Sequence, residues 1–402
     1  MLDFKAIKNN LDEWEAGLKR RGAKVNLDNL IELSGKYSDL LQKVEASRAD
    51  KNAAAKHKDV EAGKKIGKEL EKLEKDLAKL EAELEKESVE IPNLPLTDVP
   101  EGGEADGKVL GKNGEVPKIK HPKDHVELGK ILNIIDIERG VKVSGARFYF
   151  LKNQAVQLEF ALVNYVLEIL GKKGFDFLMG PQLLSEKVMM AGGYLGKAKD
   201  EVYKTQDDLY LAGTAEQSIL GYHLDEIIEV PKRYASFSTC FRREAGSYGK
   251  DVKGIIRTHQ FDKVEMFSFV VPEDSEKEHK FLVEVQEEIL QGLEIPYQKV
   301  MLAGGDLSIA SAKTIDLESW IPSQEKYRET HSCSNCTDWQ ARRGNIRYKG
   351  KDGKSEFVHT LNGTAIAIGR LLAVFLENHQ QEDGSINIPK VLQPYLGFNE
   401  IK

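Results

Sequence analysis

The chain has 402 residues, of which 41% are hydrophobic and 31% charged, and its formal net charge is −7. This length supports two or three domains with at least one sizeable core, and no apolar run reaches the roughly 18 to 20 residues that cross a bilayer. The first stretch, MLDFKAIKNNLDEWEAGLKRRG, is expected to form an amphipathic helix and lacks the apolar block of a signal peptide, so we expect a cytoplasmic protein. A nucleic-acid partner would have to meet local basic patches, because the acidic chain as a whole repels it.

Two heptad stripes occupy the first quarter of the chain. Apolar residues recur at 3,4 spacing in residues 30–44 and again in 66–84, with a polar, alanine-containing stretch between them. The second stripe ends at IPNLPLTDVPEGG, whose prolines cannot continue a helix. We expect an antiparallel two-helix hairpin over about residues 27–90 that projects on the order of 40 Å. The change of pattern near residue 100 predicts two domains, 1–100 and 101–402.

The far end of this hairpin is locally basic. Residues 48–68 contain seven Lys or Arg and three acids, a net charge of +4 on an acidic protein. Such an end could meet phosphates. The alternative is that these lysines only keep a two-helix coil in solution.

After residue 120 the pattern becomes mixed. A helix is predicted over residues 154–170, followed by a short strand in FDFLMGP, and further strands are predicted in RYASFST, GIIRTHQFDKVEMFSFVV and KSEFVHTL. Hairpin-like connections favour an antiparallel sheet flanked by helices, an α+β arrangement. Neither a GxxxxGK[ST] P-loop nor a GxGxxG fingerprint is present.

The segment FRREAGSYGKDVKGIIRTHQFDKVE, residues 241–265, places charges at strand-like spacing. Arg242 and Glu244 are expected to share one face of a strand, and Arg257, Phe261 and Glu265 one face of the next. A glycine-punctuated loop would join the strands into a hairpin (Gly246, Gly249 and Gly254). Guanidinium groups match phosphate oxygens, a phenyl face stacks a base, and a carboxylate holds an ammonium, so the set suits a nucleotide beside an amino acid. The alternative is a set of cross-strand ion pairs on a solvated face.

Two later stretches add charged candidates. YRETHSCSNCTDWQARR places Glu329 near Ser332, a carboxylate and a hydroxyl that could hold Mg²⁺ against phosphates, although such a pair alone is a weak signal. LNGTAIAIGRLLAVFLEN is expected to run from a strand through Asn362 and Gly363 into an apolar helix that carries Arg370. This arginine requires an anion or a carboxylate, and a buried structural ion pair would satisfy it as well.

Taken in this order, the stretches resemble the class II aminoacyl-tRNA synthetases, and within them the bacterial seryl-tRNA synthetase family. Residues 241–265 resemble the second signature motif of the class, LNGTAIAIGRLLAVFLEN resembles the third, and Pro181 fits the proline of the first. The helical hairpin, IPNLP, SGARFYFL, TAEQSI and SCSNCTDWQARR also resemble this family, so the similarity covers essentially the whole chain.

The resemblance implies a role for each of these residues. Three arginines would act in catalysis by binding the phosphates (Arg242, Arg257 and Arg370). ATP contacts would also come from a wider set (Arg243, Glu244, Phe261, Glu329 and Ser332), with Mg²⁺ held by Glu329 and Ser332. The serine pocket would be lined by six residues (Thr214, Ala215, Glu216, Arg242, Glu265 and Thr364).

The resemblance also implies the reaction and the partners. Serine would be activated by ATP to seryl-adenylate and then transferred to the 3′ end of serine tRNA. The hairpin would reach the long variable arm of a tRNA bound to the other subunit of a homodimer. A relative that charges a carrier protein would have no use for this hairpin, and a catalytically dead scaffold would be expected to lose Arg242, Arg370 or Glu329, all of which are present.

Some details depart from the family pattern. Thr330 and His331 stand where a valine and a serine are frequent, and Thr364 replaces a more usual serine while keeping the hydroxyl. A zinc site is conceivable from Cys333, Cys336, Cys240 and His331, but a second CxxC is missing and the family segment binds no metal. His259 could be an acid or base, but the reaction needs none, which favours a hydrogen-bonded structural role.

Overall fold

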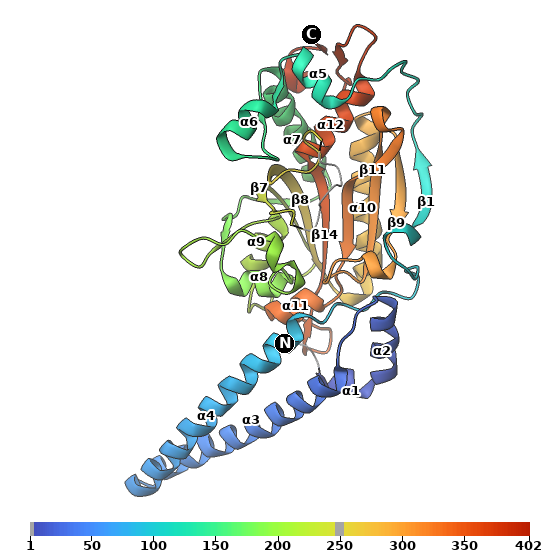
Figure 1. The fold of residues 1–402 in the computed structure, drawn as a ribbon. Helices are drawn as coiled ribbons and strands as arrows, with labels where there is room; N and C mark the ends of the chain where they lie inside the picture. Colours follow the sequence, from blue (N-terminus) through green and yellow to red (C-terminus); the bar gives the residue numbers. More distant parts are fainter. Residues whose placement is uncertain (1–3, 246–252) are drawn as a thin grey trace. The chain divides into compact units, whose positions relative to one another are not determined.

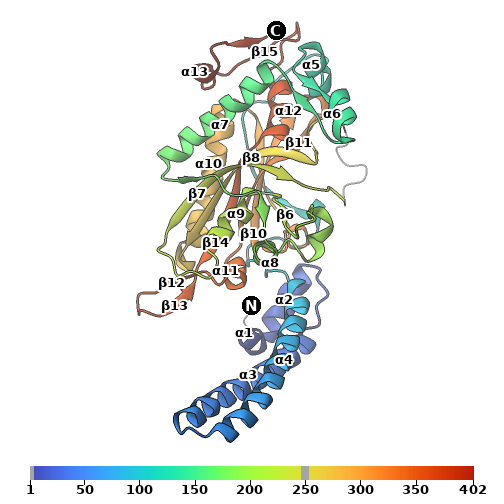
Figure 2. The ribbon, with the colours of Figure 1, turned by 90° about the vertical axis from the view of Figure 1, so that its left-hand side faces the viewer.

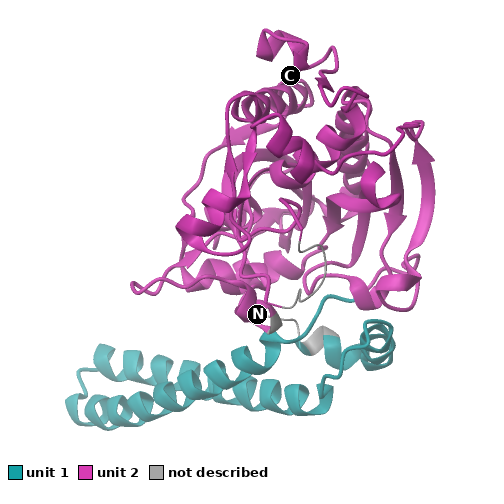
Figure 3. Ribbon diagram, turned by 45° about the horizontal axis from the view of Figure 1, so that its top comes forward, with its two compact units in different colours: residues 1–94 teal, residues 95–402 magenta. Residues whose placement is uncertain are grey.

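The computed structural model describes residues 4–245 and 253–402. The chain separates into two compact units, Met1–Leu94 and Pro95–Lys402, which are coloured teal and magenta in Figure 3. Each unit has its own hydrophobic core. In the part of the chain that is described, no helix combines the length and hydropathy needed to span a membrane.

Unit 1 is helical throughout, and its long hairpin confirms the predicted arm. The helices are α1 (Phe4–Asn9), α2 (Leu11–Arg20), α3 (Leu27–Lys56) and α4 (Val60–Val89). Helices α3 and α4 have 30 residues each, so each spans about 45 Å at a rise of 1.5 Å per residue. The side chains of Asn26 and Asp59 cap the two helices by accepting hydrogen bonds from backbone N–H groups.

The base and the tip of the hairpin differ in packing. At the base, leucines of both long helices form a core with α1 and α2 (Leu27, Leu30, Leu33 and Leu84, with Phe4, Ile7, Leu18 and Ile91). Toward the tip the buried contacts thin out, and Arg48 of α3 donates to Glu74 of α4 at 2.7 Å. The polar stretch expected between the stripes is itself mostly helical, and only three residues, 57–59, form the turn.

The N-terminal amphipathic helix is not continuous. Its described part is broken at Asn10, which has φ −130° and ψ 43°. Asparagine competes for backbone hydrogen bonds and is a poor residue for a helix interior, which accounts for the break. Residues 1–3 lie outside the described part.

Unit 2 is built on an eight-stranded sheet, visible in Figures 1 and 2. In spatial order the strands are β1 (Lys108–Asn113), β9 (Tyr297–Met301), β10 (Lys313–Ile321), β11 (Lys326–Asn335), β14 (His359–Ala367), β8 (Gln260–Val270), β7 (Lys232–Phe241) and β4 (Asp176–Leu178). All neighbours pair antiparallel except β4, which lies parallel to β7 at the edge. The antiparallel sheet expected from the sequence is therefore confirmed, with one parallel pair, β4 and β7, that the sequence does not predict.

Short elements complete the unit. Four two-stranded sheets pair β2 (Ile135–Asp136) with β3 (Phe150–Leu151), β5 (Leu183–Leu184) with β6 (Tyr210–Leu211), β12 (Arg347–Lys349) with β13 (Ser355–Phe357), and β15 (Ile386–Asn387) with β16 (Glu400–Ile401). The helices are α5 (His125–Ile131), α6 (Ile137–Ser144), α7 (Gln154–Lys172), α8 (Glu186–Gly192), α9 (Ala215–Tyr222), α10 (Ser275–Gly292), α11 (Trp339–Gly344), α12 (Ile368–His379) and α13 (Gln393–Leu396). Single 3₁₀ turns lie at η1 (Glu104–Asp106), η2 (Lys197–Glu201), η3 (Pro272–Asp274), η4 (Gly304–Asp306) and η5 (Pro322–Gln324).

The two faces of the sheet have different roles. Val264, Met266 and Val270 of β8 join the main core, to which α7, α10 and α12 contribute most of the helical side chains. Figure 1 shows α10 running along β11 and β14. Because side chains alternate along a strand, Phe261, Lys263 and Glu265 of β8 lie on the opposite face, where the sheet carries a cavity.

Three expected boundaries are wrong. Strand β8 begins at Gln260, so residues 254–259 belong to a loop and not to the strand. The stretch KSEFVHTL is divided at Val358 between β13 and β14. Asn362 and Gly363 lie inside β14, and the helix that carries Arg370 begins only at Ile368. Short apolar runs fit a strand or a helix equally well, and the sheet register decides between them.

Candidate active site

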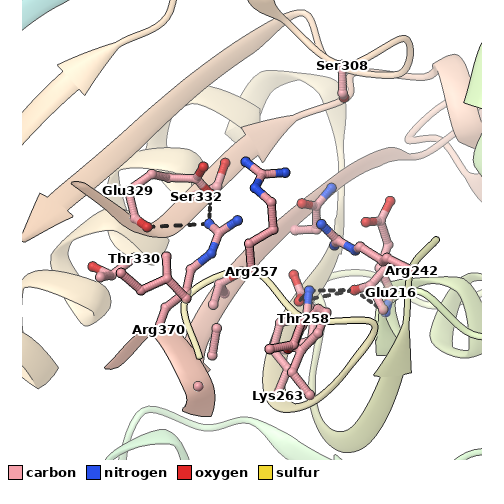
Figure 4. A pocket seen from close by; sticks show the side chains of 18 of the residues that line it. Glu216, Arg242, Arg257, Thr258, Lys263, Ser308, Glu329, Thr330, Ser332 and Arg370 are labelled. Atoms are coloured by element: carbon pink, nitrogen blue, oxygen red, sulfur yellow. Dashed lines mark hydrogen bonds and ion pairs between the residues drawn. The ribbon is translucent and has the colours of Figure 1, made fainter. Parts of the chain in front are cut away.

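One cavity of about 250 Å³ in unit 2 collects almost all the predicted site residues (Figure 4). Its lining includes Thr214, Glu216, Arg242, Glu244, Arg257, Phe261, Glu265, Glu329, Ser332, Thr364 and Arg370. The predicted residues Arg243 and Ala215 do not line it. The guanidinium of Arg243 lies 5.9 Å from the ring centre of Tyr203, and Ala215 is buried at the start of α9.

Small residues on the neighbouring strands make room for the cavity. On β7, Ser236 lies opposite Glu265, Ser238 opposite Lys263 and Cys240 opposite Phe261. Residues directly opposite in an antiparallel pair project to the same face, so these short side chains leave the longer ones of β8 free to line the cavity. The alternation of small and large residues on two paired strands therefore shapes the site.

Arg242 and Glu244 reach the cavity by a route other than the one expected. Strand β7 ends at Phe241, and Glu244 has a φ of +50°, so the two side chains do not share a strand face. A loop conformation directs both of them into the cavity instead. Two of the expected loop glycines, Gly246 and Gly249, lie outside the described residues.

His259 holds this loop in place. The backbone N–H of Arg242 donates to the carbonyl of His259 at 3.0 Å, and the imidazole Nδ1 of His259 donates to the carbonyl of Arg242 at 2.9 Å. The guanidinium of Arg147 donates to the carbonyl of Glu244 at 3.1 Å. The hydrogen bonds expected for His259 are thus present, and a structural role for it stays a prediction.

Two of the arginines of the cavity are paired with its carboxylates. Arg257 Nη1 lies 2.5 Å from Glu244 Oε2, and Arg370 Nη1 lies 2.7 Å from Glu329 Oε1. Figure 4 shows the three guanidinium groups of Arg242, Arg257 and Arg370 pointing into the same space. The cavity therefore concentrates positive charge at one side. Arg242, unlike the other two, donates to the backbone carbonyl of Gly213 at 3.2 Å.

Gly369 allows two of these arginines to approach. A Cβ at this position would lie 2.8 Å from the carbonyl oxygen of Ile255, closer than any real side chain allows. The loop that carries Arg257 can therefore lie against the start of α12, one residue before Arg370. A close backbone approach is a common reason for glycine at such a position.

The carboxylates near Arg370 are strongly perturbed. Burial raises the pKa of Asp316 well above its usual range, and the charge of Glu329 adds to the effect. Burial also acts to raise the pKa of Glu329, but the charge of Arg370 and its hydrogen bond outweigh burial and lower that pKa. Asp316 and Ser332 lie directly opposite each other on β10 and β11.

The other end of the cavity is a polar pocket. Thr214 caps α9 and donates to Glu265 Oε2 at 3.2 Å, while Lys263 Nζ donates to Thr214 Oγ1 at 2.7 Å. Lys263 and Glu265 also form a buried ion pair. Burial and the neighbouring Glu265 raise the pKa of Glu216, whose oxygens accept hydrogen bonds from Tyr194 and Gln340.

The residues that depart from the family pattern make contacts that the structure defines. His331 is buried, and burial lowers its pKa to about 4. Its ring bonds the hydroxyl of Thr330 at 2.9 Å and the carbonyl of Ala365 at 3.1 Å. Thr364 lines the cavity opposite Glu265. Cys240, Cys333 and Cys336 are buried and are not joined in disulfides, and residues 4–245 and 253–402 contain no group of three or more His, Cys, Asp or Glu arranged to hold a metal.

Several cavity residues are not predicted from the sequence. Lys263, Tyr194, Ser334, Cys336 and Asn362 also line the cavity. Asp316, together with Glu318 and Arg328, lines an adjoining cavity of about 460 Å³ that shares Arg257, Glu329 and Arg370 with the first. Lys263 carried a usable signal, because it stands at i+2 from Phe261 and at i−2 from Glu265 on the same strand face. Tyr194 carried none.

Comparison with known proteins gives two family matches. Residues 1–95 match the model of the seryl-tRNA synthetase N-terminal domain, and residues 199–379 match that of the class II tRNA synthetase core domain (G, H, P, S and T). The serine–tRNA ligase of Mycolicibacterium smegmatis is 42% identical over 98% of both chains. Serine–tRNA ligase 1 of Streptomyces avermitilis is 48% identical over 78% of this chain and 75% of its own.

Solved structures show the same similarity. A Pyrococcus horikoshii seryl-tRNA synthetase complexed with ATP superposes with a TM-score of 0.88 at 38% identity, over 100% of this chain and 99% of its own. A Giardia lamblia prolyl-tRNA synthetase, at 17% identity over 67% of this chain and 55% of its own, reaches a TM-score of 0.58 and shares the fold alone. The chain therefore belongs to the seryl-tRNA synthetase family of class II aminoacyl-tRNA synthetases.

Proposed function

We propose that this chain is a serine–tRNA ligase that activates L-serine with ATP and transfers it to the 3′ end of serine tRNA. The observation that carries the proposal is the meeting of Arg242, Arg257 and Arg370 in one cavity that is also lined by the aromatic ring of Phe261 and contains a polar pocket. Guanidinium forks suit polyphosphate, and the polar pocket suits a small zwitterion.

ATP would bind along the arginine side of the cavity. Arg242 would contact the α-phosphate and Arg370 the γ-phosphate, with Arg257 beside them. Phe261 would stack on adenine. The guanidinium carbon of Arg242 lies 5.4 Å from the centre of the Phe261 ring, so a cation is already placed beside the proposed adenine site. Glu244 would contact the adenine side. Arg243 does not line the cavity, and a contact from it to ATP would require its side chain to leave Tyr203.

The residues near Arg370 fit a magnesium ion. Asp316 Oδ1 is buried and accepts no hydrogen bond from the described residues, beside the oxygens of Glu329 and Ser332. Hard oxygen donors with one or two carboxylates are the usual protein contribution to Mg²⁺ bound with substrate phosphates, so a dedicated cluster of three is not needed. Glu329 and Ser332 would hold the ion, which would neutralise charge on the phosphates.

Serine would occupy the polar pocket. Thr214, Glu216, Glu265 and Thr364 offer hydroxyl and carboxylate oxygens for its ammonium and hydroxyl groups, and Arg242 offers a cation for its carboxylate. Ala215 is not exposed to the cavity and would act through its place at the start of α9. A pocket whose groups expect a hydroxyl rejects alanine by roughly 10⁴ in favourable cases, because those groups would be left unpaired.

The chain's part in the reaction is mainly electrostatic. The serine carboxylate must approach an anionic α-phosphate, and two unit charges about 4 Å apart repel by about 4 kcal/mol at an effective dielectric of 20. Arg242 and Arg257 would offset this repulsion and stabilise charge on the pentavalent phosphorus. The ribose hydroxyl of the terminal adenosine would then attack the carbonyl of the adenylate. Alignment of the two reactants supplies the rest, and no side chain is needed as nucleophile.

Residues 1–100 would form the tRNA-binding arm and residues 101–402 the catalytic domain. The +4 tip of α3 and α4 carries exposed lysines that would contact phosphates of the tRNA variable arm. With this function the protein would act in the cytoplasm, where tRNA is charged for translation.

A homodimer is proposed from exposed apolar side chains of unit 2. Val143, Phe160 and Met179 are 68%, 62% and 82% exposed, on α6, on α7 and just after β4. A contiguous patch of exposed apolar side chains marks an association surface, and these three side chains would belong to such a patch. An isologous dimer would cover them and complete the tRNA-binding arrangement, in which the arm of one subunit serves the other.

The test of the proposed function is amino-acid-dependent ATP–pyrophosphate exchange with serine, threonine and alanine side by side. Exchange with serine alone supports the proposal, and exchange with none of the three, or equally with alanine, contradicts it. Charging of serine tRNA in the same preparation then separates a tRNA ligase from an enzyme that loads a carrier protein.

A further inference from the structure

Lys263 is a buried cation of the polar pocket to which the proposed function gives no role. Its side chain is 6% exposed, and its strand neighbours are the small residues Ser238 and Ala367. A lysine is almost never buried without a partner, and in this pocket it takes space that a smaller residue would leave to a ligand. Figure 4 shows Lys263 among the side chains that line the cavity.

The two carboxylate oxygens of Glu265 have different surroundings, because Lys263 pairs with only one of them. Lys263 Nζ forms an ion pair with Glu265 Oε2 and donates to Thr214 Oγ1 at 2.7 Å, and Thr214 Oγ1 donates to the same Oε2 at 3.2 Å. Glu265 Oε1 accepts no hydrogen bond from residues 4–245 and 253–402, while Glu265 lines the cavity. One oxygen is therefore engaged by the protein, and the other is left available to a ligand.

In the polar pocket, the number of cations equals the number of carboxylates only when Lys263 is included. The ionisable groups near its ammonium are Glu265 on β8, Glu216 on α9, Cys240 on β7, Arg242 after β7 and Tyr194. Glu216 is engaged on both oxygens, by Tyr194 and by Gln340. Two carboxylates thus face two cations, and a zwitterion enters without changing the balance.

We propose that Lys263 is a specificity-determining residue: its ammonium occupies one side of Glu265, so that the pocket accepts neutral hydrogen-bonding side chains and excludes amino acids with an ammonium on the β-carbon. This inference rests on the proposed function. A charged 2,3-diaminopropionate has the shape of serine but brings its second ammonium toward that of Lys263. Like charges placed together in a buried site are strongly disfavoured.

The first test measures kcat/KM in ATP–pyrophosphate exchange with serine and with 2,3-diaminopropionate for the wild type, Lys263→Gln and Lys263→Met. The kcat/KM for serine divided by the kcat/KM for diaminopropionate is expected to fall by at least about tenfold in both variants, because Glu265 can then pair with the added ammonium. Lys263→Arg keeps the charge and should keep the preference for serine. Lys326→Gln, an exposed lysine of β11, serves as the matched control and should behave as the wild type.

An equal loss with both substrates in the Lys263 variants would leave the ratio unchanged and overturn the proposal, since a purely structural lysine would act in that way. Unchanged serine preference in well-folded Lys263→Met would do the same. If the wild type gives no exchange with serine, the proposed function fails instead, so the two failures are distinguishable.

The second test needs no variant and can be done even if the buried substitutions do not fold. Diaminopropionate loses its second ammonium proton in the neutral range and becomes a neutral mimic of serine. Its inhibition constant against serine exchange in the wild type, divided by the KM for serine, should fall by about tenfold from pH 6 to pH 8.5. A ratio that is constant or rises with pH would contradict exclusion of the cation.

Discussion

The guanidinium of Arg370 on α12 lies 2.7 Å from Glu329 Oε1 on β11. The cation proposed for the γ-phosphate and the carboxylate proposed for magnesium are therefore bound to each other. Glu329 raises the pKa of Arg370, and Arg370 lowers that of Glu329 against the effect of burial. The pair behaves as one electrostatic unit.

The first prediction follows from this pairing. Glu329→Gln and Arg370→Met are each expected to lower kcat for serine-dependent exchange by about 100-fold or more, the usual cost of removing one transition-state donor. The double variant should lose little beyond the worse single variant, because residues that act as a unit are not additive. Steady-state exchange kinetics of the three variants measure this coupling, and fully multiplicative losses would show that the two residues act independently.

The second prediction concerns Glu265. Glu265→Ala and Glu265→Gln should both abolish serine-dependent exchange. Glu265→Ala should also lower the free energy of unfolding by about 3–5 kcal/mol, because it leaves the buried ammonium of Lys263 without its partner. Glu265→Gln keeps an oxygen for Lys263 and should cost less. Urea unfolding at pH 7 measures the stability, and near-normal exchange in either variant would remove Glu265 from the serine pocket.

The third prediction concerns the pH dependence of the free energy of unfolding, to which Glu159 contributes. Burial raises the pKa of Glu159 on α7 from 4.5 to about 8, helped by its hydrogen bond with Asp262. Because the folded carboxyl keeps its proton where the unfolded one loses it, this group makes the free energy of unfolding fall as pH rises from about 4.5 to 8.

Glu159→Gln mimics the protonated form and should remove that part of the slope. Relative to the wild type, the variant should gain on the order of 2 kcal/mol between pH 5 and pH 9, a value discounted because the group is partly exposed. Urea titrations at both pH values measure the difference. Parallel pH profiles for the two proteins would mean that Glu159 is ionised in the folded state at neutral pH.

The fourth prediction tests the tip of the arm. Changing Lys64, Lys65 and Lys68 to alanine should raise the KM for tRNA and reduce the slope of log affinity against log salt by about one for each phosphate that the variant no longer binds. Adenylate formation should be unaffected. Lys72, Lys79 and Lys86 of the same helix form the matched control set. A similar effect in both sets would indicate a diffuse charge effect and not specific binding at the tip.

A chain with a shortened arm provides a stricter test of tRNA binding by the arm. Removing residues 30–85 would take Leu30, Leu33 and Leu84 from the core at the base of the hairpin, so that deletion would also damage unit 1. Replacing residues 45–73 with a short turn keeps this core. Exchange should remain and tRNA charging should disappear, whereas equal loss of both activities would contradict separate roles for the two units.

The fifth prediction concerns association. Phe160→Asp combined with Met179→Asp should convert a dimer into a monomer, because a charge placed in an apolar interface must be desolvated. Val109→Asp changes a residue of β1 that is 50% exposed and serves as the control. Light scattering coupled to size-exclusion chromatography measures the mass. An unchanged dimer in the double variant would place the interface elsewhere.

The helical arm and the antiparallel character of the sheet could both be predicted from the amino-acid sequence. Heptad spacing in residues 30–44 and 66–84 reports a local periodicity that any folded form must bury, and the resulting helices α3 and α4 lie where the pattern predicted. The kind of ligand could also be predicted from the sequence, because the residue types of 241–265 are those that bind phosphate, purine and ammonium groups.

The way in which those groups meet depends on the tertiary structure. Strand periodicity placed Arg242 and Arg257 correctly in the cavity but for the wrong reason, because both lie in loops whose direction depends on a positive φ at Glu244 and on the space left by Gly369. Asp316 and Tyr194 come from segments far from the motifs and enter the site through sheet register and loop packing. Such long-range contacts leave no local pattern in a single sequence, because the partner that makes a residue functional is distant along the chain.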